Sequence, residues 1–266
     1  MDFKRGASQL LTSHHNPKIK QIMRLRERKE RDLTGLFLIE GERELTRAID
    51  AGVGIDSLFL FEEHEGHAIA QKAATIYLCP KALFQKFSYR ESPDGFLAIA
   101  RQNPRSIDSL KSAKNPLFVV AESIEKPGNL GTILRSADGV SADGVIVCDR
   151  CTDVYNPNVV RASTGTLFTQ SVIEESSEKT LAWLKASGIK ILAATPHAKT
   201  LYTDADLTGP LAIVVGSEEK GLSKLWMERA DLQVAIPMHG VSDSLNVATA
   251  TTLLLYEALR QRSSKA

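Results

Sequence analysis

The stretch LFVVAESIEKPGNLGTILRSADG, residues 117–139, decides the fold class of this chain. Its first five residues, 117–121, are all apolar and predict a buried strand, which a polar, glycine-containing loop and a helical pattern follow. The same alternation continues to the end of the chain. Further strands are expected at 144–148, 169–173, 189–194, 211–216 and 232–237. Near-continuous apolar strands that alternate with helices are typical of an α/β protein with a buried, mostly parallel sheet flanked by helices.

The last expected helix, 244–261, closes this alternation. Leu245, Thr249, Thr252, Tyr256 and Leu259 share one of its faces at helical spacing.

Upstream of residue 117 the sequence predicts a second, smaller α/β unit. Strands are expected at 37–40, 55–61, 76–79 and 96–100, and helices at 41–52, 65–73 and 81–87. Before this unit, Asn16 and Pro17 form a plausible N-cap and first turn of one short basic helix over 16–31. The expected domains are a basic segment 1–34, a small domain 35–101, a polar linker 102–116 and a larger domain 117–266.

The uneven spread of charge in this chain points to a polyanionic partner. The 266 residues carry a formal net charge of +1, with 43% hydrophobic and 24% charged residues, as in an ordinary globular protein. Residues 1–31 hold nine basic and three acidic residues, a sum of +6, which leaves −5 for the remainder. A basic start on a slightly acidic body suggests a nucleic-acid contact.

Three cysteines are too few for a disulfide scaffold, so a reducing, cytoplasmic environment is expected. Cys148-x-x-Cys151 lacks a second Cys or His pair, so no metal site is predicted. No apolar run is long enough to cross a membrane, so no membrane association is expected.

Three polar loops follow strands of the larger domain, at 122–139, 216–223 and 237–250. In open α/β sheets, ligands bind at the carboxyl ends of strands, so these loops are the candidate site. None contains G-x-G-x-x-G or G-x-x-x-x-G-K-[ST], which weighs against a dinucleotide-dependent oxidoreductase and against a P-loop NTPase.

NLGTILR (129–135), GSEEKGL (216–222) and IPMHGVSDSLNVATA (236–250) resemble the three signature motifs of the SpoU/TrmH family. Members of this SPOUT-class family are S-adenosyl-L-methionine (AdoMet)-dependent RNA ribose 2′-O-methyltransferases. EKPGN (125–129) resembles the ribosomal-RNA branch more than the tRNA branch. Residues 36–101 resemble the RNA substrate-binding domain of many members, which is similar to ribosomal protein L30e.

The resemblance implies a trefoil-knotted catalytic domain, AdoMet as the cofactor, and a homodimer formed through the knotted domain. It also implies a catalytic set of five residues: Arg135, Asn129, Glu218, Ser244 and Asn246. A guanidinium is a poor proton acceptor, so Arg135 is expected to hold a phosphate and stabilise the developing 2′-oxyanion. Asn129 and Ser244 also suit helix N-caps.

The resemblance implies cofactor contacts, largely through backbone groups, at Thr195, Gly216, Ile236, Met238 and Leu245. The basic residues expected to contact RNA are Lys18, Lys20, Arg24, Arg28, Arg43 and Arg161, where Arg161 also suits a dimer or structural contact.

The function expected is therefore methyl transfer to a ribose 2′-hydroxyl of large-subunit, 23S-type rRNA. Two alternatives stay open at this point. One is a tRNA 2′-O-methyltransferase, and the other is a non-catalytic RNA-binding or ribosome-assembly protein with the same fold.

Overall fold

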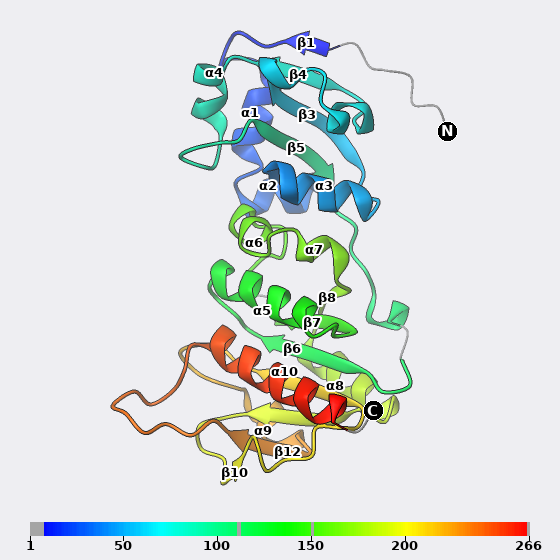
Figure 1. The fold of residues 1–266 in the computed structure, drawn as a ribbon, viewed down its shortest axis with the longest axis vertical. Coiled ribbons are helices and arrows are strands. Elements are labelled where there is room, and N and C mark those ends of the chain that lie inside the picture. Colours follow the sequence, from blue (N-terminus) through cyan, green and yellow to red (C-terminus); the bar gives the residue numbers. More distant parts are fainter. Residues whose placement is uncertain (1–7, 111–112, 150–151, 265–266) are drawn as a thin grey trace. The chain divides into compact units, whose positions relative to one another are not determined.

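The computed structural model describes residues 8–110, 113–149 and 152–264, and the chain divides into two compact units (Figure 1). The N-terminal unit comprises Met1–Asn103 and Asp153–Thr169, and the C-terminal unit comprises Pro104–Thr152 and Gln170–Ala266. This division differs from the predicted domain limits chiefly at 153–169, which pack with the N-terminal unit. A buried ion pair is one of the contacts that join this segment to the unit, since Arg31 Nε lies 2.7 Å from Asp153 Oδ2. The domain limits given from the sequence, at residues 34, 101 and 116, stay a prediction.

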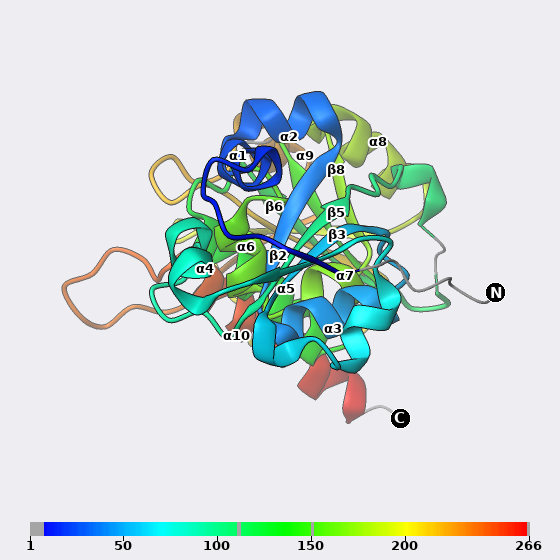
Figure 2. The ribbon, with the colours of Figure 1, turned by 90° about the horizontal axis from the view of Figure 1, so that it is seen from above.

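The N-terminal unit contains a five-stranded mixed sheet in the order β1-β4-β3-β5-β2. Its strands are β1 (Ser8–Leu10), β2 (Leu36–Glu40), β3 (Ile55–Phe61), β4 (Ile76–Cys79) and β5 (Phe96–Arg101). Its helices are α1 (Pro17–Arg24), α2 (Arg28–Thr34), α3 (Glu42–Asp50), α4 (Lys81–Phe87), α6 (Pro157–Ala162) and α7 (Thr166–Thr169). Figure 2 shows α1 and α3 on opposite sides of this sheet.

Two helices predicted for this unit are wrong in detail. The basic segment 16–31 is not one helix, because α1 ends at Arg24 and α2 begins at Arg28. Arg31 stabilises this break, since its guanidinium donates to the carbonyl oxygens of Leu25 at 2.8 Å and Arg26 at 2.7 Å. The helix predicted at 65–73 is a short 3-10 helix over Ala68–Lys72. Both differences depend on tertiary contacts that local periodicity does not contain.

The C-terminal unit contains a seven-stranded sheet in the order β10-β12-β9-β11-β6-β7-β8, and every neighbouring pair is parallel. This confirms the predicted parallel sheet. The strands are β6 (Leu117–Glu122), β7 (Gly144–Cys148), β8 (Val172–Glu175), β9 (Lys190–Ala194), β10 (Thr200–Leu201), β11 (Leu211–Val215) and β12 (Leu232–Ala235). The helices are α5 (Pro127–Gly139), α8 (Ser177–Ala186), α9 (Lys224–Arg229) and α10 (Val247–Ser263).

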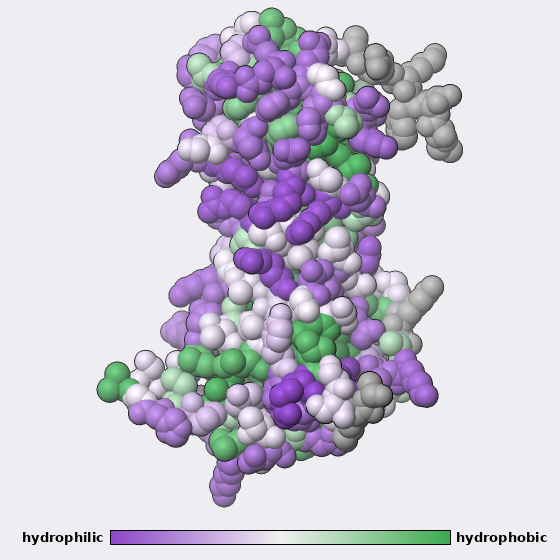
Figure 3. Space-filling model, in the orientation of Figure 1, coloured by the Kyte–Doolittle hydropathy of each residue, from purple (hydrophilic) through white to green (hydrophobic). Residues whose placement is uncertain are grey.

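Figure 1 shows α10 lying along α5 in the C-terminal unit, and Ser136 Oγ meets Thr252 Oγ1 at 2.6 Å between them. The predicted face of α10 is not its buried face. Tyr256 on the predicted face is 49% exposed, whereas the buried side chains are Val247, Ala248, Thr251, Leu254, Leu255, Glu257 and Ala258. Figure 3 shows hydrophobic side chains gathered over this α5–α10 face.

The path of the chain through the parallel sheet positions the site. β11 lies between β9 and β6, and β12 lies on the other side of β9. Since all four strands are parallel, their carboxyl ends share one edge of the sheet, and each of the three motif loops begins there. No helix in the described part of the chain is long and apolar enough to cross a membrane.

Candidate active site

A chain of side-chain hydrogen bonds joins all three motifs at this edge. Asn246 Nδ2 donates to Asn129 Oδ1 at 3.1 Å, and Asn129 Nδ2 donates to Glu218 Oε1. Asn129 lies in the first turn of α5, Glu218 follows β11, and Asn246 precedes α10. The fold therefore brings together three residues of the predicted catalytic set that are widely separated along the chain.

The helix-capping roles differ from those expected. Asn246 is the N-cap of α10, because its Oδ1 accepts from the backbone N–H of Ala248 at 3.0 Å. The prediction that Ser244 caps this helix is therefore wrong, and the Ser244 side chain is exposed in the loop before α10. Asn129 is no N-cap either, since α5 has Lys126 at that position. Both ends of the Asn129 amide are instead used in contacts to the other two motifs.

Glu218 presents one unsatisfied carboxylate oxygen. Its Oε1 accepts from Asn129, while its Oε2 is buried and has no hydrogen-bond partner among the described residues. A buried acceptor without a donor costs free energy, roughly 1–3 kcal/mol. Such an atom in a polar loop at the carboxyl edge of a sheet can accept a hydrogen bond from water or from a bound ligand.

The second motif forms a tight backbone turn that requires glycine at position 216. Ser217 and Gly221 exchange two backbone hydrogen bonds, of 3.1 and 3.0 Å. A Cβ built on Gly216 would lie 2.2 Å from the carbonyl carbon and oxygen of Gly221. The backbone of Gly221 therefore excludes a side chain at Gly216 whether or not a ligand is bound.

Sequence reasoning missed Glu122, which fixes the second motif to the sheet. This last residue of β6 is 4% exposed. Its Oε2 accepts from the backbone N–H of Ser223 at 2.8 Å, and its Oε1 accepts from Ser177 Oγ at 3.4 Å. Trp226 Nε1 donates to the same hydroxyl at 2.9 Å. The available signal was a carboxylate that directly follows five apolar strand residues.

The third motif is an exposed loop with uncommitted backbone. Within the described chain, residues 236–245 make no backbone–backbone hydrogen bond outside the regular elements. Ile236, Met238 and Leu245, three predicted cofactor residues, are half-buried, and Val241 is fully exposed. Free backbone groups beside half-buried apolar side chains suit a ligand held by main-chain contacts.

Thr195 lies beside the start of this loop. Its backbone N–H donates to the carbonyl of Val234 at 3.0 Å, and its Oγ1 accepts from the N–H of His197 at 3.3 Å. Because Val234 lies two residues before Ile236, the Thr195 turn and the third motif begin next to each other. Among the described residues, no hydrogen bond joins Thr195 to Met238 or Leu245.

Arg135 is exposed on α5 and has no side-chain partner among the described residues. The structure therefore does not bring it into contact with Asn129, Glu218 or Asn246. Its guanidinium remains available to a ligand.

The predicted RNA-contacting residues divide into two groups. Four are paired with acidic neighbours: Lys18 with Asp56 at 3.8 Å, Arg24 with Glu30 at 3.4 Å, Arg28 with Asp32 at 3.5 Å, and Arg43 with Glu44 at 2.9 Å. Lys20 and Arg161 are exposed, and neither has a side-chain partner in the described part of the chain. The positive charge open to RNA is therefore smaller than the sum over residues 1–31 suggests.

No cluster of three potential metal ligands occurs among the described residues. Cys148 is buried, and burial raises the pKa of its thiol to about 12. Cys151, the second cysteine of the Cys-x-x-Cys pattern, lies outside the described residues.

Comparison with known proteins is consistent along the whole chain. Residues 116–256 match the SpoU rRNA Methylase family, and residues 16–98 match the MRM3-like substrate binding domain. A 23S rRNA (uridine(2479)-2′-O)-methyltransferase of Streptomyces viridochromogenes is 32% identical over 252 residues, which cover 90% of this chain and 88% of that protein.

Two solved structures cover nearly the full length. The crystal structure of an RNA 2′-O ribose methyltransferase has a TM-score of 0.85 at 42% identity, covering 96% of this chain and 100% of its own. The AdoMet-bound rRNA methyltransferase of Sinorhizobium meliloti has a TM-score of 0.89 at 28% identity, covering 95% and 98%.

Proposed function

Because the chain belongs to the SpoU rRNA methylase family, we propose that it transfers a methyl group from AdoMet to a ribose 2′-hydroxyl of rRNA. The observation that carries this function is the hydrogen-bonded series from Asn246 through Asn129 to Glu218, which assembles one site from three motifs. An intact polar site of this kind argues against a non-catalytic RNA-binding protein.

Large-subunit, 23S-type rRNA is the proposed target. The Streptomyces viridochromogenes relative is named for 23S rRNA, and EKPGN at 125–129 lacks the Asp-Pro-His-Asn sequence often found in tRNA-methylating relatives. No observation in the structure favours tRNA instead.

The residues at the carboxyl edge fit AdoMet. The orphaned Oε2 of Glu218 offers a buried acceptor, and the backbone of 236–245 offers free donors and acceptors. Thr195, Gly216, Ile236, Met238 and Leu245 are the residues proposed to hold the cofactor. When bound, AdoMet supplies an activated methyl group, so the protein's main task is alignment with the 2′-oxygen.

Arg135 is proposed to stabilise the negative charge that develops on the 2′-oxygen. Its guanidinium is exposed and free of side-chain partners in the described structure, so it can contact a phosphate or the reacting ribose. A positioned cation stabilises a developing oxyanion without taking its proton. Asn129, Glu218 and Asn246 are proposed to fix the loops around this reaction, with Ser244 adding a hydrogen bond.

A trefoil knot and a homodimer are part of this proposal. The knot is supported by the order of β9, β11 and β12 and by the return of α10 onto α5 and β11. The dimer, formed through the knotted domain, is supported by exposed apolar side chains on α10 and the third motif, Leu253, Tyr256 and Val241. We further propose a cytoplasmic enzyme without metal, whose N-terminal domain is L30e-like and binds RNA.

A radiolabel transfer assay tests the function. Purified protein is incubated with methyl-tritiated AdoMet and either rRNA or tRNA, and the RNA is digested to nucleosides. The expected product is a 2′-O-methylnucleoside from rRNA only. Label in tRNA alone would favour the alternative substrate, and AdoMet binding without any transfer would favour a non-catalytic protein.

A further inference from the structure

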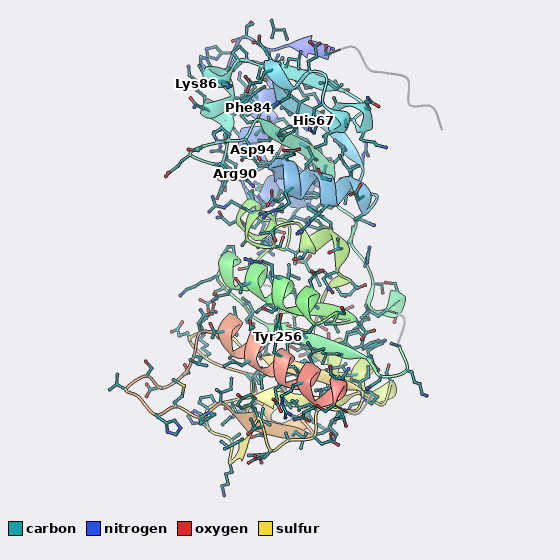
Figure 4. All side chains as sticks on the ribbon, in the orientation of Figure 1. His67, Phe84, Lys86, Arg90, Asp94 and Tyr256 are labelled. Carbon is teal, nitrogen blue, oxygen red and sulfur yellow. The ribbon has the colours of Figure 1, made fainter. Side chains whose placement is uncertain are left out.

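A small pocket in the N-terminal unit lies outside the candidate active site. It is lined by Leu38, Glu40, Phe87, Tyr89, Arg90, Leu97, Pro157 and Arg161 and is partly open to solvent. Its floor comes from β2 and β5, and its rim comes from the loop after α4 and from α6. Figure 4 shows Arg90 and Asp94 on that loop.

The loop after α4 is held rigidly by one buried carboxylate. Glu40 is 8% exposed. Its Oε2 accepts from the backbone N–H of Tyr89 at 2.7 Å, and its Oε1 accepts from Ser88 Oγ and from the N–H of Arg90 at 3.2 Å. Because its oxygens are occupied by loop donors, Glu40 serves the architecture of the pocket.

Tyr89 is an exposed aromatic residue fixed at both ends. The guanidinium of Arg26 lies 5.4 Å from the centre of its ring. Asn158 Nδ2 donates to its hydroxyl at 3.0 Å. The side chain is nevertheless 36% exposed. A rigid, partly open aromatic ring loses little conformational entropy when a flat ligand stacks on it.

Arg161 lines this pocket, and no carboxylate among the described residues pairs with its guanidinium. Arg26 donates to the backbone carbonyls of Phe87 and Ser88 at 3.0 and 2.8 Å, and its Nε is buried without a partner in the described residues. Arg161 has no side-chain partner there at all. Arg90 differs, because it pairs with Glu44 at 3.0 Å and Asp94 at 3.5 Å.

We propose that the exposed rim of this pocket binds an unpaired nucleotide of the RNA substrate, with its base against Tyr89 and its phosphate near Arg161. An exposed aromatic ring beside an unpaired guanidinium group suits single-stranded RNA, since bases stack on the ring and a phosphate pairs with the arginine. An acidic peptide would pair with Arg161 but would leave the ring without a stacking partner. The inference rests on the proposed function, because it assigns the RNA grip of the same enzyme.

The test uses full-length protein and 5′-fluorescein-labelled decauridylate, with affinity measured by fluorescence anisotropy at several salt concentrations. Tyr89→Ala is expected to weaken binding about tenfold, as loss of one stacked base predicts. Tyr89→Phe keeps the ring and should retain most affinity. Arg161→Ala should weaken binding and lower the slope of log affinity against log salt by about 0.7, which is one phosphate contact on a single strand.

Arg101→Ala is the matched control. Arg101 is an exposed arginine of the same unit, and it lies at the opposite end of the β2–β5 pair from Glu40 and Leu97. It should change affinity less than twofold. If Tyr89→Ala unfolds, the proposal is still tested by the change in salt dependence of Arg161→Ala and by the RNA affinity of Tyr89→Phe.

Several results would overturn the proposal. The first two are an unchanged RNA affinity in both Tyr89→Ala and Arg161→Ala, and a loss of affinity in Arg101→Ala as large as theirs. The other two are competition by polyglutamate as strong as that by unlabelled decauridylate, and no decauridylate binding by the unaltered protein. AdoMet binding, measured by calorimetry in the same samples, separates this from the proposed function. Unchanged RNA affinity in variants of an active methyltransferase refutes the pocket alone, whereas absent AdoMet binding and absent methyl transfer refute the function.

Discussion

Asn246 and Asn129 meet through their side-chain amides at 3.1 Å, while the Asn246 oxygen caps α10. One residue therefore ties the start of the last helix to the first turn of α5. Its carbonyl oxygen serves the helix and its amide nitrogen serves the site, so the two roles can be separated by substitution.

Asn246→Ser should separate them. Serine caps a helix about as well as asparagine, so stability should change little. The donor to Asn129 is lost, and methyl transfer should fall about 2- to 10-fold, because one hydrogen bond between neutral groups is worth about 0.5–1.5 kcal/mol. Thermal unfolding and single-turnover methylation give the two readouts. Unchanged stability together with unchanged activity would mean that Asn246 is only a helix cap.

Gly216→Ala should disturb the second motif through its backbone. The new methyl group would overlap the carbonyl of Gly221, so the Ser217–Gly221 turn must open. We expect a drop of at least 1 kcal/mol in the free energy of unfolding, together with loss of AdoMet affinity. Denaturant unfolding and calorimetry measure these. Gly209→Ala is the matched control, since a Cβ there meets nothing within 4 Å; equal effects at both glycines would contradict the steric argument.

Arg31→Met should strongly destabilise the N-terminal unit. Arg31 and Asp153 form a buried pair at 2.7 Å, with exposures of 1% and 4%. Removing one partner leaves an unpaired buried charge and typically costs about 3–5 kcal/mol. The double variant with Asp153→Leu should recover part of this loss. Arg28→Met, at an exposed pair with Asp32, should change the unfolding free energy by less than about 1 kcal/mol. A mild Arg31→Met effect would argue against the role of this pair in holding 153–169.

Arg135→Ala should leave the fold and AdoMet affinity intact, because the Arg135 side chain is exposed and makes no hydrogen bond or ion pair with another described side chain. Methyl transfer should fall about 100- to 1,000-fold, as removal of a single oxyanion-stabilising group does in other enzymes. Circular dichroism, calorimetry and single-turnover kinetics check the three statements. Turnover near that of the unaltered protein would remove Arg135 from the catalytic set.

The larger domain could be predicted well because its strands are continuous apolar runs and its motifs all follow strand ends. The confirmed parallel sheet then places those motifs at one edge. The residues that escaped prediction depend on distant partners. Glu122 looks like an ordinary loop carboxylate in sequence, and its role is evident only once Ser177 and Ser223 lie beside it.

The basic N-terminal residues show the same limit. The sequence shows residues 1–31 only as a basic start on a slightly acidic body, yet Ser8–Leu10 pair with β4 and Arg31 is buried against Asp153. Deleting this segment would remove a strand and break a buried ion pair, so lost RNA binding in a deletion variant would not identify a phosphate contact. Point substitutions at Lys20 and Arg161, which have no side-chain partner among the described residues, are the cleaner experiment.

The proposed function of this chain is ribose methylation of rRNA. The decisive measurement is a map of ribose methylation across the large-subunit rRNA, made with and without the protein. We expect one 2′-O-methylated nucleotide that appears with the protein and AdoMet and is missing with Arg135→Ala. An identical methylation map with and without active, AdoMet-binding protein would contradict it.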